Sequence, residues 1–359
     1  MSRNPILTTP ALNIGTFRRA VLGLSLGLAM GCQAEHSVAN HSESSQELGS
    51  ATNEASYQLE RFVQEGPSKL DVLFVVDDTS TMYPYQTLLA ANMDRFMGYL
   101  LDSSTDWHVG VITTDMQWPN ESGRLRSTEA MRAQGQRYLD ETTPDPIGTL
   151  AELAKQGTGG YGFESGLLAS YTALEVLRHF YNMGFYRETA DLAIIVISDE
   201  EDQNHGQITT SEYISWLENL KPGNEKVTFN AIVQPDPPTE SRLDGLWDSF
   251  EPTAYEYLAV VDTIGGNSAN INWMSWSETL ETIGLESSGL LSEFFLAQHP
   301  VQETLEVTVT QGTQTVAFDE GDCEDDCYTY DPIQNSIRFN NYPPPGGSQI
   351  TVKYELAAE

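Results

Sequence analysis

Three oxygen-bearing side chains occupy alternate positions in residues 77–81, which read Asp-Asp-Thr-Ser-Thr. In an extended segment alternate side chains point the same way, so the Asp77 carboxylate and the Thr79 and Thr81 hydroxyls can converge. Mg²⁺ is a hard cation that binds oxygen ligands and retains waters in its other positions. The spacing therefore predicts a divalent-cation site, with Mg²⁺ as the expected ion and Mn²⁺ or Ca²⁺ as alternatives.

Buried strands are needed to position these residues. Residues 72–76 are Val-Leu-Phe-Val-Val, a run typical of a strand covered on both faces in a parallel sheet. A second run, residues 191–198, ends at Asp199, and residues 107–115 predict a third strand between the two. Because ligands of such sheets bind beyond the carboxyl ends of the strands, we expect Asp77 and Asp199 to share a site.

Helical periodicity follows these strands, and strand and helix alternate up to about residue 300. This pattern predicts an α/β fold, a doubly wound, mostly parallel sheet with helices on both faces. Residues 301–359 instead alternate apolar and polar side chains between turns and predict a small all-β unit. The expected helices are residues 80–101, 166–180, 212–220, 255–264 and 277–283, and the further strands are residues 226–233 and 290–297.

These motifs resemble the von Willebrand factor type A family, whose metal-ion-dependent adhesion motif, Asp-x-Ser-x-Ser, follows the first strand. Threonines replace both serines here and keep the hydroxyl groups. The resemblance covers about residues 69–300, within a domain placed at residues 68–300. It implies a Rossmann-like fold and a metal shell that contains Asp77, Thr79, Thr81 and Asp199.

The family also supplies a threonine from a loop that precedes a helix. Residues 156–164 form a glycine-rich loop in which Thr158 is the hydroxyl of the right kind. Glu164 lies closer to the expected helix start and is the alternative, binding directly or through water. Glu200 and Asp202 follow the second acidic strand end and are expected to support the metal ligands from further out.

The resemblance implies a non-enzymatic binding or adhesion protein, in which Mg²⁺ keeps one position open for a carboxylate of a protein partner. A Mg²⁺-dependent hydrolase of phosphate esters and a metal-free cell-envelope scaffold are the alternatives. Neither motif holds a lysine or arginine that could stabilise a transferring phosphate, and no Gly-x-Ser-x-Gly or His-Glu-x-x-His is present. The histidines are scattered along the chain, and only His205 lies near the predicted site, so we assign no general base. We therefore expect a binding protein rather than an enzyme.

The N-terminal residues predict export. Arg18 and Arg19 precede a short apolar run, and residues 28–32, Leu-Ala-Met-Gly-Cys, resemble a bacterial lipoprotein signal. We expect residues 1–31 to be removed and Cys32 to carry lipid. Gln33 is not the aspartate of inner-membrane retention, so the resemblance implies the outer membrane; a periplasmic or secreted protein is the alternative. Residues 32–67 are polar and predict a flexible tether.

The charge balance limits the partners. The chain has 18 Lys+Arg and 52 Asp+Glu, a net charge of −34, which argues against nucleic acid because phosphates would be repelled. We expect membrane contact only through the lipid on Cys32. Cys323 and Cys327 are spaced for a small-loop disulfide in an exported protein, rather than for a zinc site that needs two more ligands.

Overall fold

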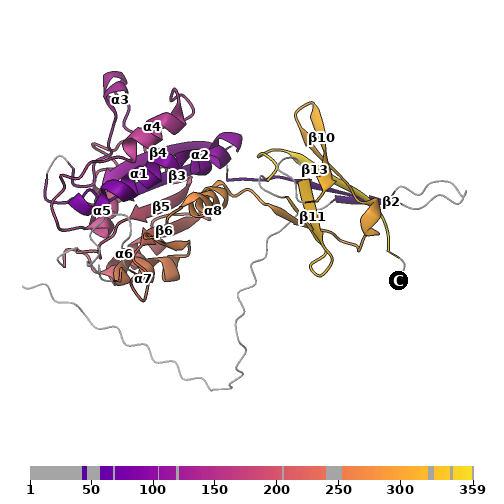
Figure 1. Ribbon diagram of the computed structural model, residues 1–359. Helices are drawn as coiled ribbons and strands as arrows, with labels where there is room; N and C mark the ends of the chain where they lie inside the picture. The colour runs from indigo at the N-terminus through magenta and orange to yellow at the C-terminus, as the bar shows by residue number, and fades with distance from the viewer. Residues whose placement is uncertain are drawn as a thin grey trace, which may run out of the picture. The chain divides into compact units, whose positions relative to one another are not determined.

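The computed structural model describes residues 43–46, 57–67, 69–103, 105–118, 121–203, 206–239, 253–321, 327–339 and 343–357. The predicted signal segment with Cys32, as well as His205 and Cys323, lies outside these ranges. Within them, the chain forms an α/β domain and a separate β-sheet unit (Figure 1). The helices in these ranges are too short or too polar to span a membrane.

Five parallel strands form the sheet of the α/β domain, in the order β4-β3-β5-β6-β7. They are β3 (Lys69–Val76), β4 (Asp106–Thr113), β5 (Asp191–Ile197), β6 (Val227–Val233) and β7 (Ser268–Asn270). Val76 pairs with Thr113 on one side and with Ile197 on the other, so the three strands end level with one another. The predicted parallel sheet is confirmed, and β7 is an addition to it.

Helices cover both faces of this sheet, which explains why β3 lacks an apolar and polar alternation. Val72, Phe74 and Val76 pack into one core, and Leu73 and Val75 pack into the other. Each such side chain contributes about 1.5–3 kcal/mol when fully buried. The first core is closed by α1 (Tyr83–Ala91), α2 (Met93–Asp102), α4 (Pro146–Leu153) and α8 (Ser277–Ser288), and the second by α5 (Gly166–Tyr171), α6 (Thr210–Glu218) and α7 (Tyr255–Ile264).

Two predicted helices are interrupted. The helix expected over residues 80–101 begins as a 3-10 turn, η1 (Ser80–Met82), and is divided at Asn92, whose side-chain amide donates to Leu88 O at 2.8 Å. Such side-chain bonds to the backbone compete with helical hydrogen bonding. The helix expected over residues 166–180 continues from α5 as a π-helical turn, η2 (Thr172–Val176), and ends there.

The segment after β4 covers the edge of the parallel sheet. Val109 and Leu139 exchange backbone hydrogen bonds of 2.9 and 2.8 Å, which pairs this edge strand and limits its exposure to other chains. The same segment contains α3 (Glu129–Gln134) and the start of α4. The described part of this segment therefore has a structural role at the edge of the sheet.

A buried acid at the amino end of β3 is paired with a cation supplied by the protein. The Asp71 carboxylate accepts from Arg187 Nε at 2.8 Å and from Arg187 N at 2.6 Å. A second carboxylate, Asp106, accepts from Arg187 Nη1 at 2.6 Å. A charge removed from water is tolerated when it is paired and hydrogen-bonded in this way.

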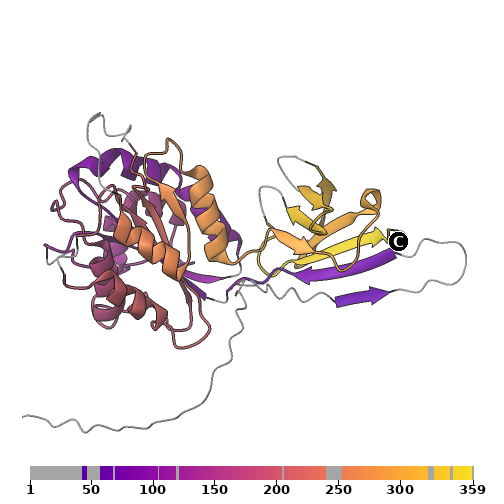
Figure 2. The same ribbon diagram turned by 90° about the horizontal axis from the view of Figure 1, so that it is seen from below.

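The β-sheet unit has the strand order β1-β2-β13-β9-β10-β11-β12-β8. Its strands are β1 (Glu43–Gln46), β2 (Tyr57–Val63), β8 (Glu293–Phe295), β9 (Glu306–Gln311), β10 (Gln314–Glu320), β11 (Cys327–Asp331), β12 (Ser336–Phe339) and β13 (Gln349–Glu355), and a 3-10 turn, η3 (Gln302–Thr304), precedes β9. Figure 2 shows the purple β2 beside the yellow β13, which pair in antiparallel register. Phe62, Phe294, Tyr328 and Ile350 are among the residues of its core.

Two segments of the sequence belong to a different unit from the one predicted. Tyr57–Val63 was expected to be part of a flexible tether, but it is strand β2 of the β-sheet unit. Glu293–Phe295, within an expected late strand of the α/β domain, pairs with β12 instead. The α/β domain is therefore inserted between two strands of the β-sheet unit. Cys327 of that unit is disulfide-bonded.

Candidate metal centre

The candidate site lies where β3, β4 and β5 end. Asp77 N donates to Ile197 O at 3.0 Å, and Thr114 N donates to Val76 O at 3.3 Å. These backbone bonds continue the pairing of the strands by one residue. Asp77, Thr114 and Ser198 are thereby placed side by side at the carboxyl edge of the sheet, and Asp199 directly follows Ser198.

The Thr79 hydroxyl of the predicted motif contacts Asp77, and the Thr81 hydroxyl lies next to that of Thr79. The Asp77 carboxylate is fully buried, and its Oδ1 accepts from Thr79 N at 2.8 Å and from Thr79 Oγ1 at 2.7 Å. Thr79 Oγ1 lies 3.3 Å from Thr81 Oγ1. Oδ2 of the same carboxylate accepts from Ser198 Oγ at 2.6 Å. One carboxylate and three hydroxyl groups thus form a continuous set of oxygen atoms.

Gln86 of α1 fixes the glycine-rich loop beside this set. Its side-chain nitrogen donates to Asp77 O and to Gly157 O, both at 2.8 Å, and its side-chain oxygen accepts from Gly157 N at 3.0 Å. The loop is therefore attached to the strand that carries the motif. Thr158, the threonine predicted to bind the metal, follows Gly157 and is exposed.

Glu164 is the loop residue that the structure brings into the site. Its carboxyl group is buried; Oε2 accepts from the Thr114 hydroxyl, whereas Oε1 has no hydrogen-bond partner among the described residues. Burial, followed by the negative charge of Asp77, raises the pKa of Glu164 to about 10. An oxygen buried without a partner is costly, so this atom indicates a position for a ligand or ion.

The four consecutive acids after β5, residues 199–202, have different roles in the structure. Asp199 is buried and directly follows Ser198, the hydroxyl donor to Asp77. Glu200 Oε2 accepts from Gln203 Nε2 at 2.9 Å. Asp202 Oδ1 accepts from Leu167 N in the first turn of α5 at 3.0 Å. Asp202 therefore stabilises the start of a helix, a role that the sequence did not predict.

Glu201, between these residues, serves the start of another helix. Its two carboxylate oxygens accept from Tyr255 N at 2.7 Å and from Glu256 N at 3.0 Å, the first two residues of α7. The first amides of a helix have no partner within the helix, and a carboxylate there also interacts favourably with the helix dipole. Of the four consecutive acids, Asp199 remains the candidate ligand.

The electrostatics of the site favour a bound cation. Burial raises the pKa of Asp77, although hydrogen bonds from Ser198 and Thr79 lower it. The charges that act on Glu164 include the carboxylates of Asp77, Asp78 and Glu200. Asp71 at the other end of β3 has Arg187 as its cation, and a divalent ion would supply the equivalent charge here. Carboxylate and hydroxyl oxygens fit Mg²⁺, Mn²⁺ or Ca²⁺.

Several contributors were not predicted from the sequence. Ser198 and Thr114 each donate to a carboxylate of the site, and both stand at a strand end directly before an acid. That position is the signal that could have identified them. Asp78, Asp115 and Glu121 form a further group of acids, in which one carboxylate oxygen from each residue lies within 4.8 Å of the other two.

Exposed aromatic side chains accompany the site residues. Tyr83 is 71 % exposed, Trp118 55 %, Tyr161 45 % and Phe163 40 %. Tyr83 follows the motif, and Trp118 N and Tyr161 N donate to the carboxylate of Asp115 at 3.3 and 3.0 Å. The rings of Tyr161 and Phe163 are 5.5 Å apart. Large exposed rings that are fixed at their backbone are typical of surfaces that bind proteins.

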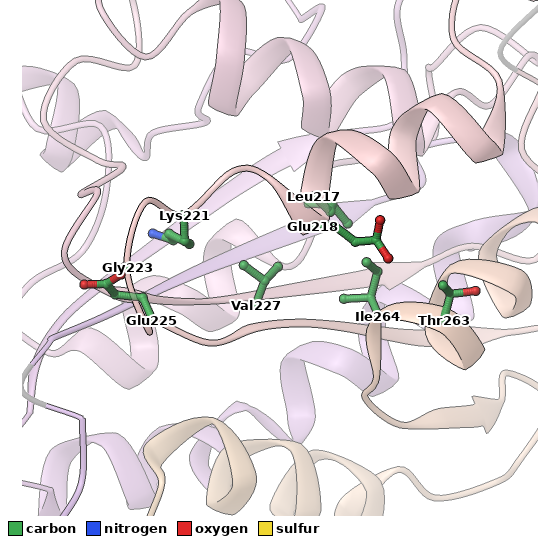
Figure 3. A pocket seen from close by; sticks show the side chains of 8 residues that line it. All are labelled: Leu217, Glu218, Lys221, Gly223, Glu225, Val227, Thr263 and Ile264. Carbon is green, nitrogen blue, oxygen red and sulfur yellow. The ribbon is translucent and has the colours of Figure 1, made fainter. Parts of the chain in front are cut away.

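A pocket of about 230 Å³ lies elsewhere, between α6, β6 and α7 (Figure 3). Figure 3 shows Lys221 and Glu218 on opposite sides of Val227. Val227 begins β6, so this pocket is at the amino end of the strand, whereas the candidate metal centre is at the carboxyl ends of the strands. We therefore assign the pocket no part in the site.

Comparison with known proteins gives similarities to solved structures. No protein-family model and no curated protein matches the sequence. The chain is similar to a von Willebrand factor type A protein from Catenulispora acidiphila, with 11% identity, 89% of this chain and 65% of that chain covered, and a TM-score of 0.36. It is also similar to the pilus adhesin SpaC from Lactobacillus rhamnosus GG, with 8% identity, 88% and 43% coverage and a TM-score of 0.41. The chain is similar as well to proximal thread matrix protein 1 from the mussel byssus, with 12% identity, 64% of this chain and 48% of that chain covered, and a TM-score of 0.34.

The fold and the site together define an α/β domain with a five-stranded parallel sheet that carries carboxylate and hydroxyl groups at its carboxyl edge. The chain spans 65% of the first of these structures and less than half of the other two, at 43% and 48%. Identities of 8–12% leave the function to be inferred from the residues of the site.

Proposed function

We propose that this chain is an exported, cation-dependent binding protein, which uses Mg²⁺ at the carboxyl edge of its parallel sheet to bind an acidic group of a protein partner. The convergence of oxygen atoms around Asp77 carries the proposal. The Thr79 hydroxyl lies 2.7 Å from Asp77 Oδ1 and 3.3 Å from the Thr81 hydroxyl, and Glu164 adds a buried oxygen without a hydrogen-bond partner among the described residues.

Asp77, Thr79, Thr81 and Asp199 are the proposed ligands, direct or through water. Glu164 joins them in place of Thr158, because Glu164 is buried beside Asp77 whereas Thr158 is exposed. When bound, the cation supplies a positive charge and an open position that a carboxylate can fill. Mn²⁺ and Ca²⁺ remain alternatives to Mg²⁺.

The charge of the molecule and its exposed rings support an acidic protein as the partner. With a net charge of −34, the chain repels an acidic group unless a cation mediates the contact. Tyr83, Trp118, Tyr161 and Phe163 provide apolar area for the remainder of such an interface. We place the protein in the cell envelope, held in the outer membrane by a lipid on Cys32, with a periplasmic or secreted form as the alternative.

Binding of Mn²⁺, measured by the electron paramagnetic resonance of the free ion, tests the site. We expect saturable binding that Mg²⁺ displaces and that Asp77→Asn or Asp199→Asn weakens by about 100-fold, or about 2.8 kcal/mol. Glu218→Gln, which removes an exposed acid on α6, is the matched control and should bind like the unmodified chain. Equal affinity in all three variants would disprove the assignment, and no binding by the unmodified chain would favour a metal-free scaffold.

The open position is tested with acetate as a carboxylate probe and acetamide as a neutral control of similar shape. Acetate should displace water from bound Mn²⁺ and lower the water-proton relaxation rate, whereas acetamide should not. The rival function, a Mg²⁺-dependent hydrolase of phosphate esters, predicts turnover of p-nitrophenyl phosphate that Asp77→Asn abolishes. Such turnover would replace the binding proposal.

A further inference from the structure

A second group of carboxylates lies next to the proposed Mg²⁺ site and is separate from its ligands. Asp78 follows β3, Asp115 follows β4, and Glu121 comes from the segment after β4. Each offers one carboxylate oxygen, and the three oxygens lie within 4.8 Å of one another. Oxygens that bind one Ca²⁺ at Ca–O distances of about 2.3–2.6 Å lie at most about 5.2 Å apart, so this spacing is compatible with a single ion between the three residues.

The Asp78 side chain gives an independent indication of a ligand. Asp78 is 4 % exposed, and its Oδ1 atom is buried without a hydrogen-bond partner among the described residues. The backbone holds it there, since Gly160 N donates to Asp78 O at 2.9 Å. A Cβ atom on Gly160 would stand 2.4 Å from Asp78 Oδ1, so the glycine-rich loop packs directly against this carboxylate.

Neutral donors orient Asp115 without balancing its charge. Its Oδ1 accepts from Gln117 N at 2.7 Å and from Trp118 N at 3.3 Å, and its Oδ2 accepts from Tyr161 N at 3.0 Å. Oδ2 accepts a single hydrogen bond and has a further lone pair with which it can bind a cation. The Asp115 carboxylate is therefore fixed in position while it retains the capacity to bind an ion.

One protein cation partly balances the group. Glu121 Oε1 pairs with Arg126 Nη1 at 3.1 Å, and Glu121 Oε2 accepts from the Thr113 hydroxyl at 3.4 Å. When all three carboxylates are ionised, the one guanidinium leaves an excess of negative charge at a largely buried position. A divalent cation offsets this excess, and Ca²⁺ accepts irregular shells of carboxylates more readily than Mg²⁺ does.

We propose that Asp78, Asp115 and Glu121 bind a second divalent cation, of the Ca²⁺ class, distinct from the Mg²⁺ at Asp77. This ion joins the ends of β3 and β4 to the segment after β4. Through the bonds of Gly160 and Tyr161 to the same residues, it also fixes the loop that leads to Glu164. The second ion therefore orders the loop that contributes an oxygen to the first site.

Calcium titration calorimetry of the full chain tests this proposal, with the first site removed by Asp77→Asn and Asp199→Asn. In that background we expect one Ca²⁺ to remain bound, and Glu121→Gln to weaken it by at least about tenfold, or about 1.4 kcal/mol. Asp78→Asn should act in the same way. Glu141→Gln, an exposed acid further along the same segment, is the matched control and should leave the affinity unchanged.

The outcomes separate the two sites. Ca²⁺ binding that disappears with Asp77→Asn and Asp199→Asn alone, or that survives both Glu121→Gln and Asp78→Asn, would overturn the second site and leave the first intact. Far-UV circular dichroism and the Tm of each variant identify loss of fold. Glu121 is only partly buried, so its variant keeps the test valid if Asp78→Asn does not fold.

Discussion

Thr79 illustrates why a side chain with a hydroxyl group suits its position in the candidate site. Its backbone N–H and its hydroxyl both donate to Asp77 Oδ1, at 2.8 and 2.7 Å. The hydroxyl oxygen has lone pairs left, so Thr79 can orient Asp77 and still offer an oxygen to a cation. Serine retains this chemistry, and the methyl group of threonine adds bulk around it.

Replacing Thr79 separates the hydroxyl from the methyl group. Thr79→Ala should weaken Mn²⁺ binding by about 10- to 100-fold, because a ligand and a hydrogen bond to Asp77 are lost together, at about 1.4–2.8 kcal/mol. Thr79→Ser should bind within about threefold of the unmodified chain, because the hydroxyl remains. Electron paramagnetic resonance of free Mn²⁺ provides both affinities. If the alanine and serine variants lose affinity equally, Thr79 acts through packing and is no ligand.

The spacing of Asp77, Thr79 and Thr81 could be recognised in the sequence because an extended strand end directs alternate residues to one side. Local spacing cannot show which loop residue reaches the same point. Thr158 matches the expected residue type but is exposed, whereas Glu164 is buried. The path of the glycine-rich loop decides between them, and contacts with distant residues such as Gln86 set that path.

At the scale of elements, consecutive acids after β5 serve different parts of the fold. Asp202 accepts a backbone N–H of α5 and Glu201 accepts two of α7, so two helices begin at the edge that holds the candidate site. The same acidic sequence is compatible with a ligand cluster or with helix caps. Only the placement of the helix N-termini distinguishes these roles, and a single sequence does not give that placement.

Glu201→Ala tests this division of roles. Loss of both bonds to the amides of α7 should destabilise the chain by about 0.5–2 kcal/mol, the usual cost of removing a helix cap. The affinity for Mn²⁺ should stay unchanged, since Glu201 faces a helix terminus. Urea unfolding gives the first quantity and Mn²⁺ titration the second. A drop in Mn²⁺ affinity comparable to that of Asp199→Asn would mean that Glu201 belongs to the metal centre.

The parallel sheet was predictable because β3 and β5 are apolar at successive positions, which requires burial on both faces. Strand β2 could not be predicted in this way, because polar residues stand at its buried positions and large apolar side chains stand at exposed ones. The buried face of Tyr57–Val63 carries Gln58 and Glu60 as well as Phe62, while Tyr57 and Val63 are exposed. Glu60 is tolerated inside because the Tyr354 hydroxyl and Ala297 N donate to it. Both partners are more than 230 residues away in the sequence.

Across the whole molecule, the main electrostatic feature is an excess of negative charge. The net charge of −34 is spread over the chain, but several carboxylates are concentrated and buried at one edge of the parallel sheet. Burial, with Glu121 and Asp115 close by, raises the pKa of Asp78 to about 8, and the pKa of Glu164 rises to about 10. Their ordinary values are 3.8 and 4.5.

These shifts predict how stability depends on pH when cations are removed. Between about pH 4.5 and 8 the native chain binds protons at Asp78 and Glu164 that the unfolded chain has released, so its free energy of unfolding falls as the pH rises. The slope is about 1.4 kcal/mol per pH unit for each such group. In EDTA, the Tm should therefore fall by several degrees from pH 5 to 7.5.

Divalent cations should remove most of this loss, because they replace the protons as partners of the carboxylates and bind only the folded site. With saturating Mg²⁺ and Ca²⁺, the Tm should vary little over the same pH range and exceed the EDTA value most at pH 7.5. The variant Asp78→Asn with Glu164→Gln should show a flatter profile in EDTA and gain little from cations. Scanning calorimetry in EDTA and in the two cations measures all four profiles. A Tm in EDTA that is constant or rises with pH would mean that these carboxyl groups are ionised in the folded chain without a cation, and that the carboxyl edge of the sheet has no electrostatic need for a metal.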